Sequence, residues 1–188
     1  MAPRRIGGQA TLPSGEAITW TSAEGARGTR WREAVTRDGR LLRSVLLEVS
    51  ATGRPARLEL TTAAGLLTLH PEADQSALHG NVVGDAGVRH LALEWSAAHE
   101  LLVAGSPAAA TVVVWRQVPH IAVGGTAALD VVWIDDALDP RPGRWTIARI
   151  GQSDWRLQGA DGSAGVAVHL DPGGVPVLPG AVGWPLEA

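Results

Sequence analysis

The chain has 188 residues, a length typical of one domain, and 45% of them are hydrophobic while 19% are charged. This composition excludes a disordered or collagen-like chain, and the absence of cysteine excludes disulfides, thiolate nucleophiles and cysteine-ligated zinc. The net charge of −3 argues against sequence-independent binding of nucleic acid, which needs a basic surface. We therefore predict a single domain over residues 1–188, with no nucleic acid among its partners.

The first half of the chain indicates a succession of short strands joined by tight turns. The clearest turn is Asp38-Gly39, because these residue types supply the positive φ angles of a two-residue hairpin. Leu58 and Leu60 alternate with polar residues, which is typical of a strand with one wet face. In this half we expect strands over residues 30–36, 41–50, 56–62, 66–70, 77–83 and 88–95.

The second half continues in the same way, with one short helical turn expected over residues 97–102. Residues 112–115 and 131–134 are apolar on both faces of a strand. Such a strand lies either between two core layers or between the core and an apolar cavity. Residues 139–143, rich in proline, predict a turn. Strands are expected over residues 100–104, 111–118, 130–134, 145–150, 155–158, 166–170 and 175–178.

Strands spaced every 8–12 residues, with turn signals between them, predict an all-β fold. We expect antiparallel hairpins that form a β-roll, barrel-like or sandwich sheet with little helix. No apolar run approaches the roughly 18 residues of a membrane helix. The charged N-terminus is not followed by the apolar run of a signal peptide. We therefore expect a soluble, cytoplasmic protein with no integral membrane segment.

The histidines show no familiar metal-binding motif, since neither H-x-H nor H-E-x-x-H occurs. Neighbouring strands lie about 5 Å apart, so His70, His79 and His90 could still meet across three strands. Solvent-facing or hydrogen-bonded histidines are the simpler interpretation. We predict no bound metal and no cofactor.

Asp135 and Asp136, with Asp139 close by, form the paired carboxylates of the chain. Two carboxyls facing a sugar are the machinery of a glycosidase, and loop carboxylates are ligands of Ca²⁺. Adjacent residues of a strand point to opposite faces, however, which favours a strand end that enters a turn. Neither a G-x-S-x-G elbow nor a glycine-rich phosphate loop occurs. We predict no catalytic residue.

Tryptophan supplies all of the large aromatic packing, because the chain has eight Trp and no Phe or Tyr. We expect most of these side chains to be in the core. Some would line an apolar cavity, above all those on the stretches that are apolar on both faces, and a cation at its mouth would meet a polar head group. The predicted ligand-binding residues are Trp95, Trp115, Trp133, Arg116, Arg89 and His79.

The C-terminal quarter carries a family resemblance. Trp155-Arg156-Leu157, the run from Val166 to Val175 with its Asp-Pro-Gly-Gly turn, and Val177-Leu178-Pro179 resemble the end of a bacterial glycolipid-binding family. The resemblance implies a spiral β-roll with an apolar hollow for acyl chains, and a non-enzymatic protein that binds an amphiphile. The family's central Gly-Cys-x-Asp-Val-Asp segment is not found in this chain, so no functional residue is carried over.

Our leading hypothesis is non-enzymatic binding of a lipid-like or glycolipid-like amphiphile in an apolar cavity. The alternative is a metal- or carboxylate-dependent enzyme that acts on a carbohydrate. A third hypothesis is an interaction module that dimerises through an exposed sheet edge; the sequence leaves the oligomeric state open.

Overall fold

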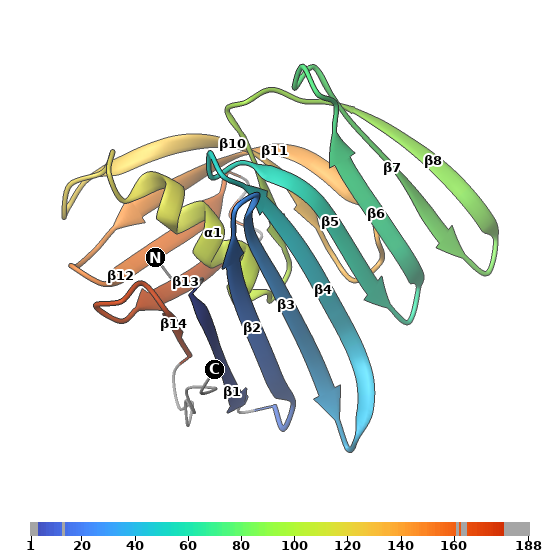
Figure 1. The fold of residues 1–188 in the computed structure, drawn as a ribbon, viewed down its shortest axis with the longest axis horizontal. Coiled ribbons are helices and arrows are strands. Elements are labelled where there is room, and N and C mark those ends of the chain that lie inside the picture. Colours follow the sequence, from blue (N-terminus) through green and yellow to red (C-terminus); the bar gives the residue numbers. More distant parts are fainter. Residues whose placement is uncertain (1–3, 13, 161, 163–164, 179–188) are drawn as a thin grey trace. The chain divides into compact units, whose positions relative to one another are not determined.

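The computed structural model describes residues 4–12, 14–160, 162 and 165–178 (Figure 1). Strands make up most of it, which confirms the predicted all-β fold class. The chain groups into two compact units, each of which is described by itself. The first holds the described residues up to Ala97 together with Asp136–Asp139, and the second holds the rest. That residues 1–188 form a single domain stays a prediction.

The first unit contains one antiparallel sheet in which every strand pairs with the next along the chain. Seven hairpins in succession therefore build the whole sheet, called here the first sheet. Its strands are β1 (Arg5–Thr11), β2 (Ala17–Gly25), β3 (Gly28–Arg37), β4 (Arg40–Ser50), β5 (Pro55–Thr62), β6 (Gly65–Pro71), β7 (Ala77–Gly84) and β8 (Gly87–Glu94).

The two faces of the first sheet differ in burial, as the alternation of the sequence predicts. Leu58 and Leu60 are fully buried, and their cross-strand partners Leu47, Leu69 and Leu67 are buried on the same face. Asp38 and Gly39 both have positive φ angles at the β3–β4 turn, which confirms the predicted hairpin. The other face carries mostly polar side chains and is called here the exposed face.

The predicted strands from residue 30 onward in this half are all present, but two strands precede them. β1 and β2 contain three glycines and several threonines in place of a long aliphatic alternation, so their local signal is weak. Gly8 has a packing reason: a Cβ atom there would lie 3.0 Å from the Trp20 ring on the paired strand. The small residues of β1 thus make room for the bulky aromatic of β2.

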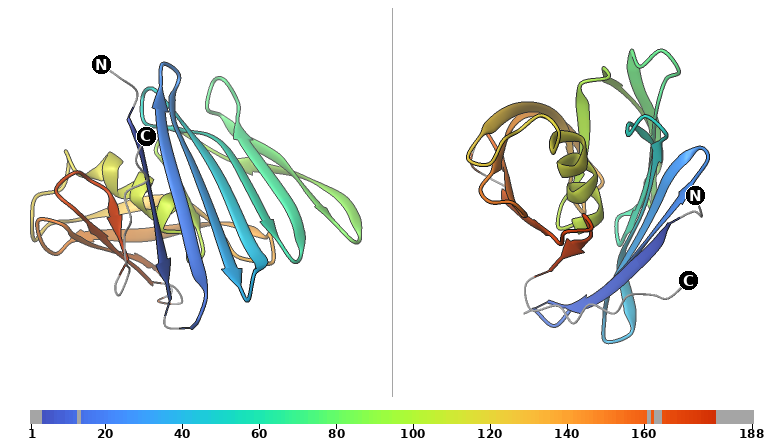
Figure 2. Two further views of the ribbon diagram at one scale, coloured as in Figure 1. Left: turned by 60° about the horizontal axis from the view of Figure 1, so that its bottom comes forward. Right: turned by 60° about the vertical axis from the view of Figure 1, so that its left-hand side comes forward.

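The second unit contains the second sheet and the helix. In spatial order the sheet runs β14, β13, β12, β11, β10 and β9, and the β9–β10 pair is parallel. The sheet curls into a half-barrel beside α1, which contacts β9, β13 and β14 (Figure 2). The elements are β9 (His99–Val103), α1 (Pro107–Gln117), β10 (Thr126–Ile134), β11 (Pro140–Arg149), β12 (Asp154–Gly159), β13 (Gly165–Leu170) and β14 (Pro176–Val177).

The strand predicted over residues 111–118 is wrong, because α1 occupies this stretch. Ser106 accepts a hydrogen bond from the Ala109 backbone N–H as N-cap, and Pro107 follows it at the start of the helix. These start signals and the alanines after them outweigh the β-branched run. Burial of the helix residues from Ala108 to Val114 explains why the run is apolar on all sides.

Two further predictions in this half are wrong. Residues 97–102 do not form a helical turn, since β9 begins at His99 and pairs in parallel with β10. Residues 139–143 are not a turn, because β11 begins at Pro140. Pro140 and Pro142 fit in a strand here because β12 pairs with β11 from Trp145 onward, so the proline stretch has no β12 partner.

The core of the second unit includes Trp145 and Trp155 together with aliphatic residues of α1, β10, β12 and β13. Trp20, Trp31 and Trp95 are buried in the first unit. Most tryptophans of the described residues are therefore core side chains, as predicted; Trp184, like Pro179 of the family resemblance, lies outside those residues. Within the described part of the chain, no helix has the length and apolar character needed to cross a membrane.

Candidate functional site

A hollow of about 410 Å³ opens on the exposed face of the first sheet. Most of its lining residues project from that face, on β2, β3, β4 and β5. They combine hydroxyl groups with short aliphatic side chains, one guanidinium and one exposed-face carboxylate. The lining residues are Thr19, Trp20, Thr21, Arg32, Glu33, Ala34, Ser44, Val45, Leu46, Glu59 and Thr61.

Strand register explains how these side chains meet. Thr19 pairs with Ala34, Ala34 with Ser44, and Ser44 with Thr61, which makes one row across four strands. A second row runs parallel to it, from Thr21 through Arg32 and Leu46 to Glu59. Directly opposite residues have Cβ atoms about 4.5–5.5 Å apart, so each row is continuous. The two rows together form the floor of the hollow.

The two charged side chains on the exposed face of the hollow, Glu59 and Arg32, differ in whether they form an ion pair. Glu59 accepts a hydrogen bond from Arg57 on the same strand and is therefore already neutralised by an ion pair. Among the residues that the structure describes, Arg32 has no ion-pair partner. The hollow consequently presents one free guanidinium beside several hydroxyl groups, an arrangement that can donate hydrogen bonds to a polar ligand.

An aliphatic row continues from the edge of the hollow. Thr61 pairs with Leu66, Leu66 with Val83, and Val83 with Val88, all on the exposed face. Leu66, Val83 and Val88 are 36%, 45% and 58% exposed. From Leu66 to Val88 the aliphatic row spans two strand spacings of about 4.8 Å, which gives it a length of about 10 Å. It is an exposed apolar track that begins at a polar hollow.

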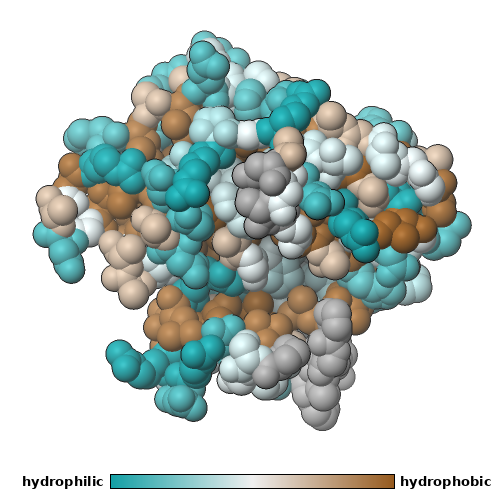
Figure 3. Space-filling view, turned by 180° about the vertical axis from the view of Figure 1, so that it is seen from behind, coloured by the Kyte–Doolittle hydropathy of each residue, from teal (hydrophilic) through white to brown (hydrophobic). Residues whose placement is uncertain are grey.

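The surface of the molecule shows polar and apolar side chains side by side. In the space-filling view from behind, hydrophilic residues in teal cover much of the visible face, and hydrophobic residues in brown gather in patches (Figure 3). Single exposed hydrophobic residues are ordinary in globular proteins. Three exposed aliphatic side chains that are direct cross-strand neighbours are less common, and their contiguity distinguishes the aliphatic row from single exposed hydrophobic residues.

The structure divides the predicted ligand-binding residues between the two units. In the first unit, the Trp95 indole donates to Gln75 Oε1 over 3.2 Å and the ring is buried. His79 Nε2 lies 2.8 Å from Glu72 Oε1. Arg89 donates to the Leu138 carbonyl over 3.2 Å. None of these three side chains lines the hollow.

The other predicted residues belong to the second unit. Trp115 lies on α1, not on a strand, and its indole donates to the Gly174 carbonyl over 2.7 Å. Arg116 Nη1 lies 2.8 Å from Glu100 Oε2. The Trp133 ring lies 4.9 Å from the Trp145 ring and packs on the core of this unit. A role for any of these residues in binding a ligand stays a prediction.

Glu100 is a buried carboxyl that is not among the residues predicted from the sequence. It lies on β9 with no exposed surface, and Arg116 and Gln117 of α1 donate hydrogen bonds to its two oxygens. Burial raises the pKa of Glu100 to about 7, against the opposing effect of the Arg116 charge. The only signal in the sequence is one acidic residue within the otherwise apolar end of a strand, Glu100-Leu-Leu-Val.

The structure places His70, His79 and His90 on one face of neighbouring strands, an arrangement that the sequence left open. His70 and His79 are direct cross-strand partners, while His90 is hydrogen-bonded to Asn81. In the described ranges, no group of three or more His, Cys, Asp or Glu side chains is arranged to hold a metal ion. A three-histidine centre is therefore not formed.

The clustered aspartates are paired with arginines, in agreement with their interpretation as a strand end that enters a turn. Asp135 pairs with Arg141 across the β10–β11 connection, at 2.9 Å. In the first unit, Asp136 lies 3.5 Å from Arg43, and Asp139 lies 3.9 Å from Arg89. Each of these carboxylates thus has a cation nearby, and their contacts hold the segment in place.

No family model matches the chain, and no curated protein matches it. Among solved structures, the chain is similar to the crystal structure of a DUF1089 family protein from Pseudomonas aeruginosa. The two are 17% identical, with a TM-score of 0.55 over 95% of this chain and 89% of the other. At this level of identity, the likeness shows that the two chains share a fold.

Proposed function

We propose that the chain binds a lipid-like or glycolipid-like amphiphile, without chemical turnover, on the exposed face of the first sheet. The head group would occupy the hollow, and the alkyl chain would follow the aliphatic row. The observation that carries the proposal is the continuity of the two: Thr61 lines the hollow and is also the cross-strand partner of Leu66, where the aliphatic row begins.

The chemistry of each part supports this arrangement. Ser44 and Thr61 offer hydroxyl groups that donate and accept hydrogen bonds, which suits the hydroxyls of a sugar. The unpaired Arg32 adds donors, and Leu46 with Ala34 gives an aliphatic surface between them. Covering the aliphatic row with an alkyl chain would remove apolar surface from water, at about 25 cal/mol per Å². A ligand with both a polar and an apolar part would therefore gain more than either part alone.

The test is calorimetric titration of the chain with octyl glucoside, kept below the concentration at which it forms micelles. Free glucose and the alkyl glycoside are compared under the same conditions. The proposal predicts saturable binding of the glycoside with a negative heat-capacity change, which marks burial of apolar surface. It also predicts much weaker binding of glucose. Absence of saturable binding, or equal binding of both compounds, would overturn the proposal.

A pair of matched variants locates the binding. Ala34→Trp fills the hollow, because Ala34 lies in the middle of its first row. Ala23→Trp places the same side chain on the same face of β2, outside the hollow. We expect Ala34→Trp to abolish binding of the glycoside and Ala23→Trp to leave it unchanged. If both variants bind as the parent does, the ligand does not occupy the hollow.

A further inference from the structure

We propose that His70 and His79 form a two-histidine chelate for a divalent transition-metal ion such as Zn²⁺ or Ni²⁺, with Glu72 as the hydrogen-bond partner of one ligand. This site lies on the exposed face of β6 and β7 and shares no residue with the lining of the hollow. It is therefore independent of the proposed amphiphile binding.

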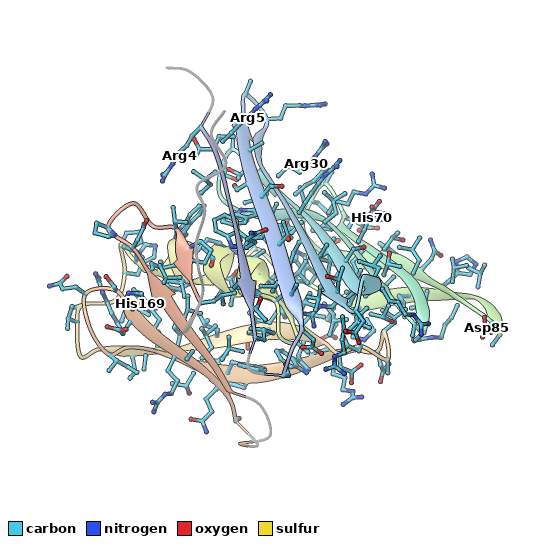
Figure 4. All side chains as sticks on the ribbon, turned by 90° about the horizontal axis from the view of Figure 1, so that it is seen from below. Arg4, Arg5, Arg30, His70, Asp85 and His169 are labelled. Atoms are coloured by element: carbon cyan, nitrogen blue, oxygen red, sulfur yellow. The ribbon has the colours of Figure 1, made fainter. Side chains whose placement is uncertain are left out.

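The geometry rests on strand register. His70 and His79 are directly opposite on an antiparallel pair, and their ring centres are 6.5 Å apart. Two imidazoles that share one ion place their ring centres about 5–6 Å apart, given metal–nitrogen bonds of about 2.0–2.1 Å. The rings must therefore approach by about 1 Å, which small χ-angle changes of partly exposed side chains can supply. Figure 4 labels His70 on the first sheet, where its side chain is exposed.

Glu72 determines which nitrogen of the neutral His79 ring carries the proton. Its Oε1 lies 2.8 Å from His79 Nε2, so the neutral ring donates from Nε2 and keeps the lone pair of Nδ1 free. A carboxylate that accepts a hydrogen bond from a histidine is the usual outer partner of a metal-binding imidazole, and it raises the basicity of the ligating nitrogen. One of the two histidines, His79, thus already has the carboxylate partner that such ligands have in metalloproteins.

Two protein ligands are enough for an exposed site of this kind, with water in the remaining positions. Imidazole ligands select Zn²⁺, Ni²⁺ and Cu²⁺ over Mg²⁺ or Ca²⁺, which prefer oxygen ligands. His90 lies on the same face of the next strand, but its direct partner is Asn81, two residues along β7 from His79, so we do not count it as a ligand. This agrees with the lack of a three-residue metal-binding group in the described residues.

The test uses the full chain without a histidine tag. Ni²⁺ is paramagnetic, so sub-stoichiometric Ni²⁺ should broaden the imidazole NMR signals of His70 and His79 before those of the other four histidines. Titration calorimetry with Zn²⁺ should give one site per chain. His70→Ala and His79→Ala should each abolish that binding, while Glu72→Gln should weaken it about tenfold or more. Mg²⁺ should give no binding heat.

His169 provides a matched control. Its Nδ1 lies 2.7 Å from Asp154 Oδ1 on a paired strand of the second unit, so it is also a histidine bonded to a carboxylate, but its direct partner across β12 is not a histidine. His169→Ala should leave Zn²⁺ binding unchanged. Equal broadening of all histidine signals, or a loss in His169→Ala or His90→Ala as large as in His79→Ala, would overturn the two-histidine site.

Discussion

Replacing Glu100 with glutamine should remove one identifiable part of the dependence of stability on pH. The pKa of Glu100 is raised in the folded protein to about 7, from an ordinary value of 4.5, because the carboxyl is buried. Between these two pH values the folded state holds more protons than the unfolded state. The free energy of unfolding therefore falls as the pH rises from about 4.5 to about 7, and this contribution then stays constant.

The size of the effect follows from the two pKa values. One pKa unit corresponds to about 1.4 kcal/mol, so the interval between 4.5 and about 7 gives about 3 kcal/mol. Glutamine does not titrate, and it keeps one acceptor oxygen for a hydrogen bond from Arg116 or Gln117, while its NH2 group takes the place of the second oxygen. The difference in unfolding free energy between Glu100→Gln and the parent should therefore change by about 3 kcal/mol, in favour of the variant, as the pH rises from 4.5 to 8.

Urea unfolding followed by tryptophan fluorescence, repeated at half-unit pH steps, measures this difference directly. Because all other titrating groups are common to both chains, their contributions cancel in the comparison. Glu94→Gln, at an exposed position on β8, is the control and should show no such change. Parallel stability curves for Glu100→Gln and the parent over this pH range would refute the reasoning.

Three further predictions concern packing and the exposed face. Leu58→Ala removes a fully buried side chain and should lower the free energy of unfolding by about 2–5 kcal/mol in urea titrations. Gly174→Ala should lower the free energy of unfolding by about 1–2 kcal/mol, because φ is +76° at this position and a Cβ atom would lie 3.0 Å from Trp115 Nε1. Gly173→Ala is the control, because φ at Gly173 lies outside the left-handed region. Val83→Asp should weaken binding of octyl glucoside at least about fivefold in calorimetry, while its unfolding midpoint stays within a few degrees of the parent's. An unchanged affinity in Val83→Asp would exclude the aliphatic row from binding.

Much of the first sheet could be predicted because its signals are local. Leu58 and Leu60 alternate with polar residues, and Asp38-Gly39 specifies a tight turn, so both features depend only on neighbours in the chain. The helix α1 was not predicted, because its β-branched run, residues 111–114, favours a strand when the flanking residues are not considered. Ser106 and Pro107 are the start signals that would have identified it.

The candidate site could not be predicted in the same way. The hollow is lined by two or three residues from each of four strands, and nothing in the local sequence distinguishes a threonine, serine or alanine that lines a binding site from one that does not. Only the register places Ser44 beside Thr61 and Thr61 beside Leu66. Trp115 and Trp133 were predicted to bind a ligand because they are large aromatic side chains on apolar stretches. In the second unit, however, Trp115 is hydrogen-bonded to Gly174, and Trp133 packs against Trp145.

Backbone amide NMR shifts during titration with octyl glucoside test the central claim most directly, because they locate the ligand on the sheet. We predict that the largest shifts occur at Thr19, Ser44 and Thr61 in the hollow and at Val83 and Val88 along the aliphatic row. Glucose alone should shift the residues of the hollow weakly and leave the aliphatic row unaffected. Shifts confined to residues outside the hollow and the aliphatic row would contradict the proposal.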